Sequence, residues 1–428
     1  MRKFASFTID NKQIFMHNAL QYAHNTYKHV IALDSSGYSN DKYSRFDFLI
    51  AIDAMQTFSN NRKSLKNASE IKDWTFGYIA YDFKNELEAL KSDNTDNLNC
   101  PNINFFQARY VILCKENTWK IEYDSSVNSE SEALALIAEI KNTKIRHFQY
   151  ERKVDIQARV SKQRYIQQVQ KIISQIHAGN IYELNYCVEF FAKGVSIEPL
   201  QAYKSLNSIS PTPLAAFLKL DDISLMCASP ERYICKQGKK LISQPIKGTI
   251  KRSKNEYEDN ILRLRLQNDT KERAENIMIV DIVRNDLSKV TQAGSVKVEE
   301  LCGVYPFKQV SQMISTIVGE LDHCHSAFDA ICASFPMGSM TGAPKHKTMQ
   351  LIEKYEDSKR GIYSGAMGYF APNGDFDFNV VIRSAIYNSL NQYLSFSVGS
   401  AITARSDANR EYDECKLKAK ALLEVLSK

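Results

Sequence analysis

Short apolar runs recur along the whole chain, and each one is interrupted after a few residues. The runs near the N-terminus are "HVIALDSS", "FDFLIAI", "FGYIAYDF" and "ARYVILC", and later ones include "SLMCAS", "GAMGYFAP" and "YLSFSVGSAIT". Runs that alternate or stay apolar for only a few residues are typical of strands. Because the strands come in groups with helical patterns between the groups, we predict an α+β fold.

The pattern divides the chain into three zones. Residues 1–120 hold the first four apolar runs, and residues 161–428 alternate clear helices with clear strands. Residues 121–160 are polar and charged, apart from one short helical pattern, "SEALALIAEI". We interpret this middle zone as a connection between a strand-rich N-terminal portion and a larger C-terminal portion.

Helices in the third zone have recognisable ends. Ser161 is placed to cap a helix with apolar residues at helical spacing, which is expected to end at Gly179. Further helices are predicted from about Asp269 to Leu287, Ser326 to Phe335, Pro344 onward, and Ala408 to Leu426. The strands between them include "IYELNYCVEFFA", a hairpin "RYICKQGKKLIS", and a meander that contains "DFDFNVVIRSAIYN".

Composition excludes several classes of protein. The net charge of +6 is mild for 428 residues and is spread along the chain, so no nucleic-acid partner is indicated. We expect neither a secretory signal nor a membrane span, because no apolar segment suits either one. Nine cysteines without a C-x-x-C pair favour a reduced, cytoplasmic protein. The segment "DHCH", with His323, Cys324 and His325, lacks further ligands and is predicted to be a solvated turn.

Two predicted helices carry the same pair of carboxylates. Glu272 and Glu275 are three residues apart, as are Glu411 and Glu414, so each pair projects from one helix face. Four carboxylates from two helices form a site suited to a hard cation such as Mg²⁺. Either pair alone is more typical of a solvated helix face, since charged residues mostly lie outside.

The segment "QPIKGTIKR" places Lys247 where Pro245 and Gly248 predict a turn. Apolar flanks and the nearby charges of Lys251 and Arg252 are both expected to depress the pKa of this lysine. A neutral amine is a nucleophile. The alternative is an ordinary exposed lysine, which the segment alone favours. The hairpin that follows "ASPERY" is expected to bring a carboxyl group, that of Glu231, near the amine.

Three other segments are candidates for binding an anion. Arg383 falls inside an apolar run, where it needs a carboxylate, supplied either by a ligand or by the protein itself. Gly399 lies late in an apolar strand, where a small residue lets backbone N–H groups approach an anion, although a bulge is the simpler reading. "GSMTGAPK", which contains Ser339, is a small-residue turn that opens a helix.

Taken in order, the motifs resemble those of the chorismate-utilising enzymes. They are "AGNIYELN", "ASPERY", "QPIKGTIKR", "KERAENIMIVDIVRNDLSKV", "VSQMISTIVGEL", "MGSMTGAPK", "RGIYSGAMGYF", "VVIRSAI" and "EYDECKLKAKAL". The strong resemblance covers about Ser161 to Leu426, and residues 1–120 resemble the family's N-terminal region more weakly. The order of so many motifs makes a chance match negligible. The resemblance implies antiparallel β-sheets packed together with helices on the outside, and a Mg²⁺-dependent reaction of chorismate in residues 161–428.

The resemblance also implies a role for each candidate residue. Lys247 corresponds to a covalent nucleophile, and Glu231 to the general acid that assists departure of the C4 hydroxyl. Glu275 and Glu414 correspond to the Mg²⁺ ligands, with Glu272 and Glu411 in support. The substrate-binding positions that carry over are Gly248, Thr249, Ser339, Tyr363, Arg383, Gly399 and Lys418. Gln312 and Ala401 depart from the family pattern, which often has His and Gly there.

Positions 247 and 183 choose among the members of the family. Anthranilate synthases typically carry Ala where this chain has Lys247, and isochorismate synthases activate water with a lysine where this chain has Glu183. The resemblance therefore implies amination of chorismate at C4, in the 4-aminobenzoate branch of folate synthesis. Anthranilate formation, isochorismate formation and a non-catalytic chorismate-binding subunit stay as alternatives. Glu183 has no explanation in the sequence.

Ammonia needs a source, and no cysteine lies in the G-x-C-x-G pattern of a glutaminase. The resemblance therefore implies a separate glutamine amidotransferase subunit as partner. It also implies a possible tryptophan pocket around Ser35, in "LDSS", although a turn capped by Ser35 is the simpler interpretation.

Overall fold

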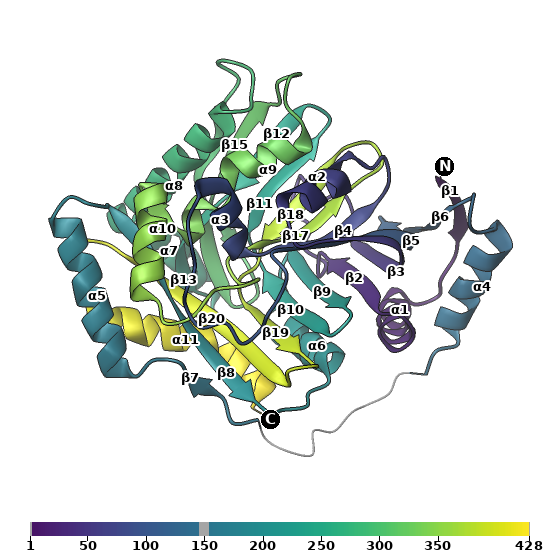
Figure 1. Cartoon of the computed structure of the whole chain (residues 1–428), viewed down its shortest axis with the longest axis horizontal. Helices are drawn as coiled ribbons and strands as arrows, with labels where there is room; N and C mark the ends of the chain where they lie inside the picture. Colours follow the sequence, from purple (N-terminus) through teal and green to yellow (C-terminus); the bar gives the residue numbers. More distant parts are fainter. Residues whose placement is uncertain (1, 145–153, 428) are drawn as a thin grey trace.

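The computed structural model describes residues 2–144 and 154–427 (Figure 1). Its 20 strands are linked by hydrogen bonds into one sheet system, in which neighbouring strands run antiparallel. The first ten are β1 (Arg2–Phe7), β2 (His29–Asp34), β3 (Phe48–Ser59), β4 (Thr75–Ile79), β5 (Ile103–Lys115), β6 (Thr118–Asp124), β7 (Gln157–Ala158), β8 (Glu183–Lys193), β9 (Leu214–Leu220) and β10 (Ile223–Ser229). The others are β11 (Arg232–Gln237), β12 (Lys240–Gln244), β13 (Ile246–Lys251), β14 (Lys297–Pro306), β15 (Val310–Glu320), β16 (Gly342–Ala343), β17 (Ala366–Phe370), β18 (Phe376–Val380), β19 (Ser384–Asn388) and β20 (Tyr393–Ile402).

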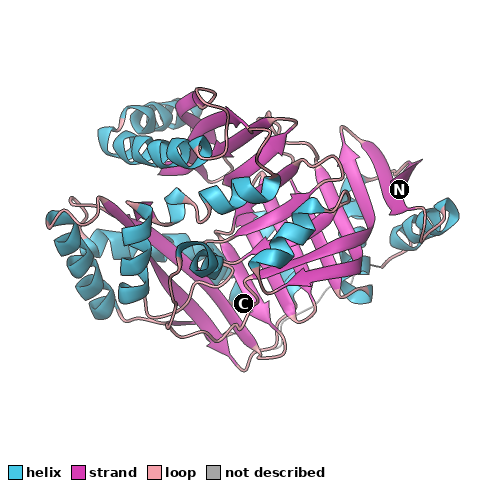
Figure 2. Cartoon of the chain, turned by 45° about the horizontal axis from the view of Figure 1, so that its top comes forward, coloured by secondary structure: helices cyan, strands magenta, loops and turns pink. Residues whose placement is uncertain are grey.

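Helices lie around the outside of the strands (Figure 2). They are α1 (Lys12–Thr26), α2 (Arg62–Glu70), α3 (Lys84–Glu88), α4 (Glu130–Lys141), α5 (Lys162–His177), α6 (Pro199–Ile209), α7 (Glu256–Asn268), α8 (Thr270–Ser288), α9 (Ala327–Ser334), α10 (Lys345–Tyr355) and α11 (Ala408–Leu426), with 3-10 turns η1 (Tyr81–Phe83) and η2 (Gly338–Met340). The α+β fold predicted from the sequence is confirmed. None of the helices in the described ranges is both long and apolar enough to cross a bilayer.

The central strands are buried on both faces. Along β2, Val30 and Ala32 join one hydrophobic core, whereas Ile31 between them joins the other. Successive side chains of a strand point to opposite faces, so an apolar run without polar gaps places one half of its residues in each core. This is why "HVIALD" reads as a continuous apolar run.

Strands of the N-terminal zone pair with strands of the C-terminal zone. β2 lies beside β9 with Val30 opposite Lys219, and β4 lies beside β17 with Ile79 opposite Ala366. The division into residues 1–120, 121–160 and 161–428 stays a prediction. Part of the proposed connection, residues 145–153, lies outside the described residues.

The helix ends predicted in the third zone are confirmed. The Ser161 hydroxyl caps α5 by accepting from the Arg164 N–H, and α8, α9, α10 and α11 begin within a residue of the expected positions. Helices α1, α6 and α7 were not predicted. In α1 the polar residues Asn18 and Gln21 are buried, which obscures the helical period.

Two local predictions are wrong. "QPIKGTIKR" is not a turn, because Ile246–Lys251 forms β13, with a bulge between Ile246 and Thr249 where it pairs with β15. The apolar run around Arg383 is not one strand. The strand is interrupted between β18 and β19, where Arg383 has a positive φ of 52°. In both places the backbone departs from a regular strand near a charged side chain, Lys247 in one and Arg383 in the other.

Candidate active site

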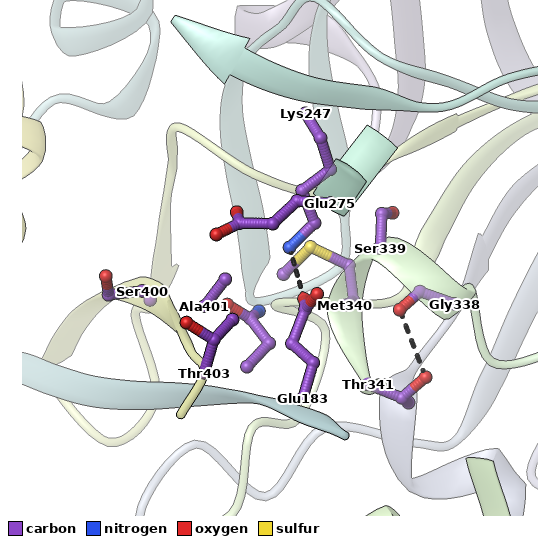
Figure 3. Close-up of polar contacts among 12 residues, drawn as sticks. Glu183, Lys247, Glu275, Gly338, Ser339, Met340, Thr341, Ser400, Ala401 and Thr403 are labelled. Atoms are coloured by element: carbon purple, nitrogen blue, oxygen red, sulfur yellow. Dashed lines mark hydrogen bonds and ion pairs between the residues drawn. The ribbon is translucent and has the colours of Figure 1, made fainter. Parts of the chain in front are cut away.

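The residues of the site come from six elements that meet beside the buried strands. β13 carries Lys247, β8 begins with Glu183, and β20 contributes Gly399 and Ser400. Ser339 lies in η2, and α8 and α11 carry the two pairs of carboxylates. Figure 3 shows Lys247, Glu275, Ser339 and Ser400 around the same space.

Lys247 is held by a buried ion pair. Its Nζ lies 2.6 Å from Oε1 of Glu183 (Figure 3), and its side chain is only 11% exposed. Burial lowers the pKa of the Lys247 amine, but the Glu183 carboxylate outweighs that effect and raises the pKa above its usual value. The expected depression of this pKa is therefore wrong, because Lys251 is exposed and Arg252 turns away to pair with Asp259 at 2.9 Å.

The backbone on either side of this ion pair is fixed. The Asn276 side chain, on α8, donates to the carbonyl of Lys247 at 3.3 Å. Glu183 lies opposite Ala343 in the short β8–β16 pairing. Gly342, next to it, has a φ of 137°, and a Cβ atom there would lie 2.1 Å from the Glu183 carbonyl oxygen.

We expect Gly342→Ala to destabilise the protein. The φ of 137° is accessible to glycine but costs any other residue about 1–3 kcal/mol, before the clash with the Glu183 carbonyl is counted. Urea titration of the variant is expected to show a lower midpoint than the wild type. Gly374→Ala is a matched control with positive φ and open space around the new methyl group, and it is expected to lose less stability. Equal losses in both variants would contradict the role assigned to the close approach.

Glu231 is a buried carboxyl group placed between Ser339 and the start of β13. Its Oε1 accepts from the Ser339 hydroxyl at 2.7 Å and from the Ile246 N–H at 3.4 Å. Burial raises the pKa of Glu231 to about 7, so the group ionises only near neutral pH. The hairpin of β11 and β12 brings it to the neighbourhood of Lys247, as the sequence predicted, and Lys247 contributes to the field at this carboxyl group.

The two pairs of carboxylates face each other across α8 and α11. Burial lowers the pKa of Lys271, but the charges of all four carboxylates together outweigh burial and raise it. Nζ of Lys271 lies 3.7 Å from Oε1 of Glu275. Glu414 pairs with Lys418 at 2.7 Å, and Lys418 also donates to the Gly399 carbonyl at 3.0 Å. The Ser400 hydroxyl donates to the Glu411 carboxylate.

The carboxylate cluster fits a hard divalent cation. Burial raises the pKa of Glu275 to about 7 and also raises that of Glu272. Burial opposes ionisation of Glu414 too, but the Lys418 ammonium outweighs it and holds the pKa of Glu414 below its usual value. Oε1 of Glu275 is buried and accepts no hydrogen bond from the described residues. Carboxylate oxygens with unsatisfied capacity are the ligands that Mg²⁺ prefers.

Arg383 offers an unneutralised guanidinium group to the site. Among the described residues its guanidinium group has no hydrogen-bond or ion-pair partner, so the internal salt bridge considered from the sequence is not present there. Burial lowers the pKa of Arg383, and the nearby Tyr363, itself buried, opposes that change. A half-buried arginine without a carboxylate is suited to a ligand that brings one.

The remaining predicted substrate positions differ in their surroundings. Gly248 has a φ of 95°, and a Cβ atom there would meet the Glu272 side chain at 3.2 Å. A Cβ atom at Gly399 would lie 2.7 Å from Sγ of Cys187. Thr249 is exposed, and its hydroxyl accepts from Gln312 at 3.4 Å across β13 and β15. Ala401 lies opposite Asn185 in the pairing of β20 with β8.

Two sequence features lie away from this site. Ser35 lines a separate cavity with Asp34, Arg45, Phe46 and Tyr369, so the tryptophan pocket there stays a prediction. The turn after β15 places the ligand atoms of Asp322, His323 and Cys324 within 4.8 Å of one another. The His323 side chain is 88% exposed, as the predicted solvated turn requires.

Glu183 is the residue that sequence reasoning missed. It begins β8 just after an exposed tyrosine, Tyr182, and nothing in its neighbours marks it as buried. Its hydrogen-bond partner, Lys247, comes from a strand 64 residues farther along the chain. A pairing across that separation has no signal in one sequence.

Comparison with known proteins gives consistent results. A family model described as "chorismate binding enzyme" matches residues 12–424. Aminodeoxychorismate synthase component 1 of Bacillus subtilis is 34% identical over 82% of this chain and 76% of its own length. Anthranilate synthase component 1 of Thermus thermophilus is 32% identical, with the same 82% and 76% coverage. The crystal structure of anthranilate synthase component I from Streptococcus pneumoniae superposes with a TM-score of 0.80 at 24% identity, covering 90% of this chain and 94% of that one.

Proposed function

The chain belongs to the family of chorismate binding enzymes, and from this premise we propose that it converts chorismate and ammonia into 4-amino-4-deoxychorismate. This is the activity named for the Bacillus subtilis relative. The observation that carries the proposal is the position of Lys247, a largely buried amine at the centre of the site, near Glu231, whose pKa burial raises to about 7. The product enters the 4-aminobenzoate branch of folate synthesis.

Each residue of the site has a task in this reaction. Arg383 and Tyr363 hold the pyruvyl carboxylate of chorismate, with support from the backbone at Gly399. Glu231 gives its proton to the C4 hydroxyl, because hydroxide is a poor leaving group. The Lys247 amine attacks C2, the double bond shifts, and water leaves from C4.

Ammonia completes the reaction. It attacks C4, the double bond shifts back, and the bond between C2 and Lys247 breaks, so that the lysine is released. The proton that the new C4 amine loses restores Glu231. The enolpyruvyl group stays intact throughout, which separates this reaction from anthranilate formation.

Glu275 and Glu414 would hold Mg²⁺, with Glu272 and Glu411 in support. When bound, the ion would supply positive charge at the ring carboxylate of chorismate. Lys418 lies beside this carboxylate cluster and, with Gly248, Thr249 and Ser339, completes the wall around the ring.

We propose a glutamine amidotransferase subunit as the partner that supplies ammonia. The name of the Bacillus subtilis relative, aminodeoxychorismate synthase component 1, implies a second component. We also propose that the enzyme works in the reducing environment of the cytoplasm, since all nine cysteines are free thiols and six of them are buried.

One assay tests the proposal. Purified protein is incubated with chorismate, Mg²⁺ and ammonium ions, and 4-amino-4-deoxychorismate is the expected product. Addition of the lyase of the folate pathway is expected to release 4-aminobenzoate, and chelation of Mg²⁺ is expected to stop the reaction. Anthranilate as the product would instead support the second candidate, favoured by the Thermus thermophilus relative. Isochorismate, or no product, would also contradict the proposal.

A further inference from the structure

The Lys247 amine has a single bonding partner among the described residues. Oε1 of Glu183 lies 2.6 Å from Nζ and accepts its hydrogen bond. Glu183 is fully buried, and its other oxygen, Oε2, accepts no hydrogen bond from the described residues. The carboxyl group is therefore committed to Lys247 and retains capacity for one more proton.

This pairing has a chemical consequence for the nucleophile. Only a neutral amine attacks carbon, yet a carboxylate at 2.6 Å favours the ammonium form. A proton must therefore leave Nζ before the attack on C2. The site excludes most water, since the Lys247 side chain is only 11% exposed, so the acceptor has to be a group of the protein.

We propose that Glu183 is the base that removes this proton. The inference rests on the proposed function and adds a residue to it. The ammonium of Lys247 passes one proton to Glu183, which becomes a carboxylic acid, and the neutral amine then forms its bond to C2. When ammonia has displaced the lysine, the released neutral amine takes the proton back. The pair returns to its starting charge, so no co-reactant is consumed.

The other charged groups that face Lys247 are less suited to this task. Glu231, from the segment between β10 and β11, accepts from Ser339 and Ile246 and spends its own proton on the leaving hydroxyl. Glu275, on α8, belongs to the carboxylate cluster that suits a cation. Burial acts to raise the pKa of Glu272, on α8, and of Glu414, on α11, and the charge of Lys247 acts to lower both. Neither carboxylate forms a hydrogen bond or ion pair with Lys247 within the described chain.

The test compares the wild type with Glu183→Gln as a function of pH. Glutamine keeps the shape of the side chain but accepts no proton, so at pH 7 we expect a loss of about 10²-fold in the rate of aminodeoxychorismate formation. The variant must release the lysine proton to solvent. The ratio of wild-type to variant rate is therefore expected to fall by about tenfold per pH unit as the pH rises. Because both enzymes need a protonated Glu231, that requirement cancels in the ratio.

Two further variants complete the test. Glu183→Asp retains a carboxylate, and it is expected to keep the pH dependence of the wild type even where its rate is lower. Tyr182→Phe changes the exposed neighbour and is expected to behave as the wild type does. Thermal melting of each variant shows whether it is folded. If Glu183→Gln does not fold, the pH dependence of the rate is compared between the wild type and Glu183→Asp.

The outcomes separate this inference from the proposed function. If Glu183 merely holds the ammonium in place, its removal lowers the pKa of Lys247, and Glu183→Gln becomes as fast as the wild type or faster at pH 7. That result, or a rate ratio that does not change with pH, would overturn the inference while leaving the product unchanged. A wild-type enzyme that forms no aminodeoxychorismate would overturn the proposed function itself.

Discussion

Lys247→Ala is expected to lower the rate of aminodeoxychorismate formation by roughly 10³- to 10⁶-fold, the range seen when an activated nucleophile is removed. The loss follows from the geometry, because no other amine hydrogen-bonds Glu183 within the described chain. Chorismate binding is expected to persist, since Arg383 and the carboxylate cluster are untouched. The measurement is the initial rate with saturating ammonium, with chorismate affinity followed by calorimetry.

Lys251→Ala is the matched control for this variant. Lys251 lies on the same strand, four residues away, but it is exposed and has no part in the site. It is expected to keep the wild-type rate. Lys247→Arg tests whether a neutral amine is needed, since arginine retains the positive charge but does not supply a neutral nucleophile. Full activity in either Lys247 variant would rule out the lysine adduct, and a switch to anthranilate would show that ammonia had entered at C2 directly.

Glu231→Gln is expected to lower the same rate by about 10²- to 10⁴-fold, the usual contribution of a general acid. The pH dependence of the rate follows from the protonation state of Glu231. Burial raises the pKa of Glu231 to about 7, and the acid form is the one that donates. The wild-type rate is therefore expected to fall as the pH rises through about 7, and this alkaline fall is expected to be absent from the residual activity of the variant.

Stability supplies an independent check on Glu231. Its pKa in the folded chain, about 7, lies above the usual value of 4.5, so the folded state binds more protons than the unfolded state between these two values. The contribution of Glu231 to stability therefore decreases as the pH rises from about 4.5 through about 7. Glu231→Gln removes this dependence, and its melting temperature relative to the wild type is expected to increase across that interval. A constant difference would show that Glu231 is already ionised at low pH.

The parts of the fold that could be predicted are those set by local chemistry. The capping serine at position 161 and the apolar period of α5 specify that helix within a few residues. The E-x-x-E spacing placed Glu272 and Glu275 on one face of α8 and Glu411 and Glu414 on one face of α11, and the structure shows that the charges of all four act on Lys271. The parts that could not be predicted depend on distant partners. The pKa of Lys247 was expected to fall because its sequence neighbours are cations, but its neighbour in space is Glu183.

The pairing of β2 with β9 and of β4 with β17 has a consequence for how the chain acquires its structure during synthesis. β4 leaves the ribosome long before β17 is synthesised. The edge of β4 that pairs with β17 therefore stays unpaired while most of the chain is made. Contacts so far apart in sequence slow folding, because a long loop has to close before they form. Exposed strand edges in such waiting intermediates are prone to aggregate. The nascent chain is therefore expected to depend on chaperones that shield these edges until its C-terminal strands emerge.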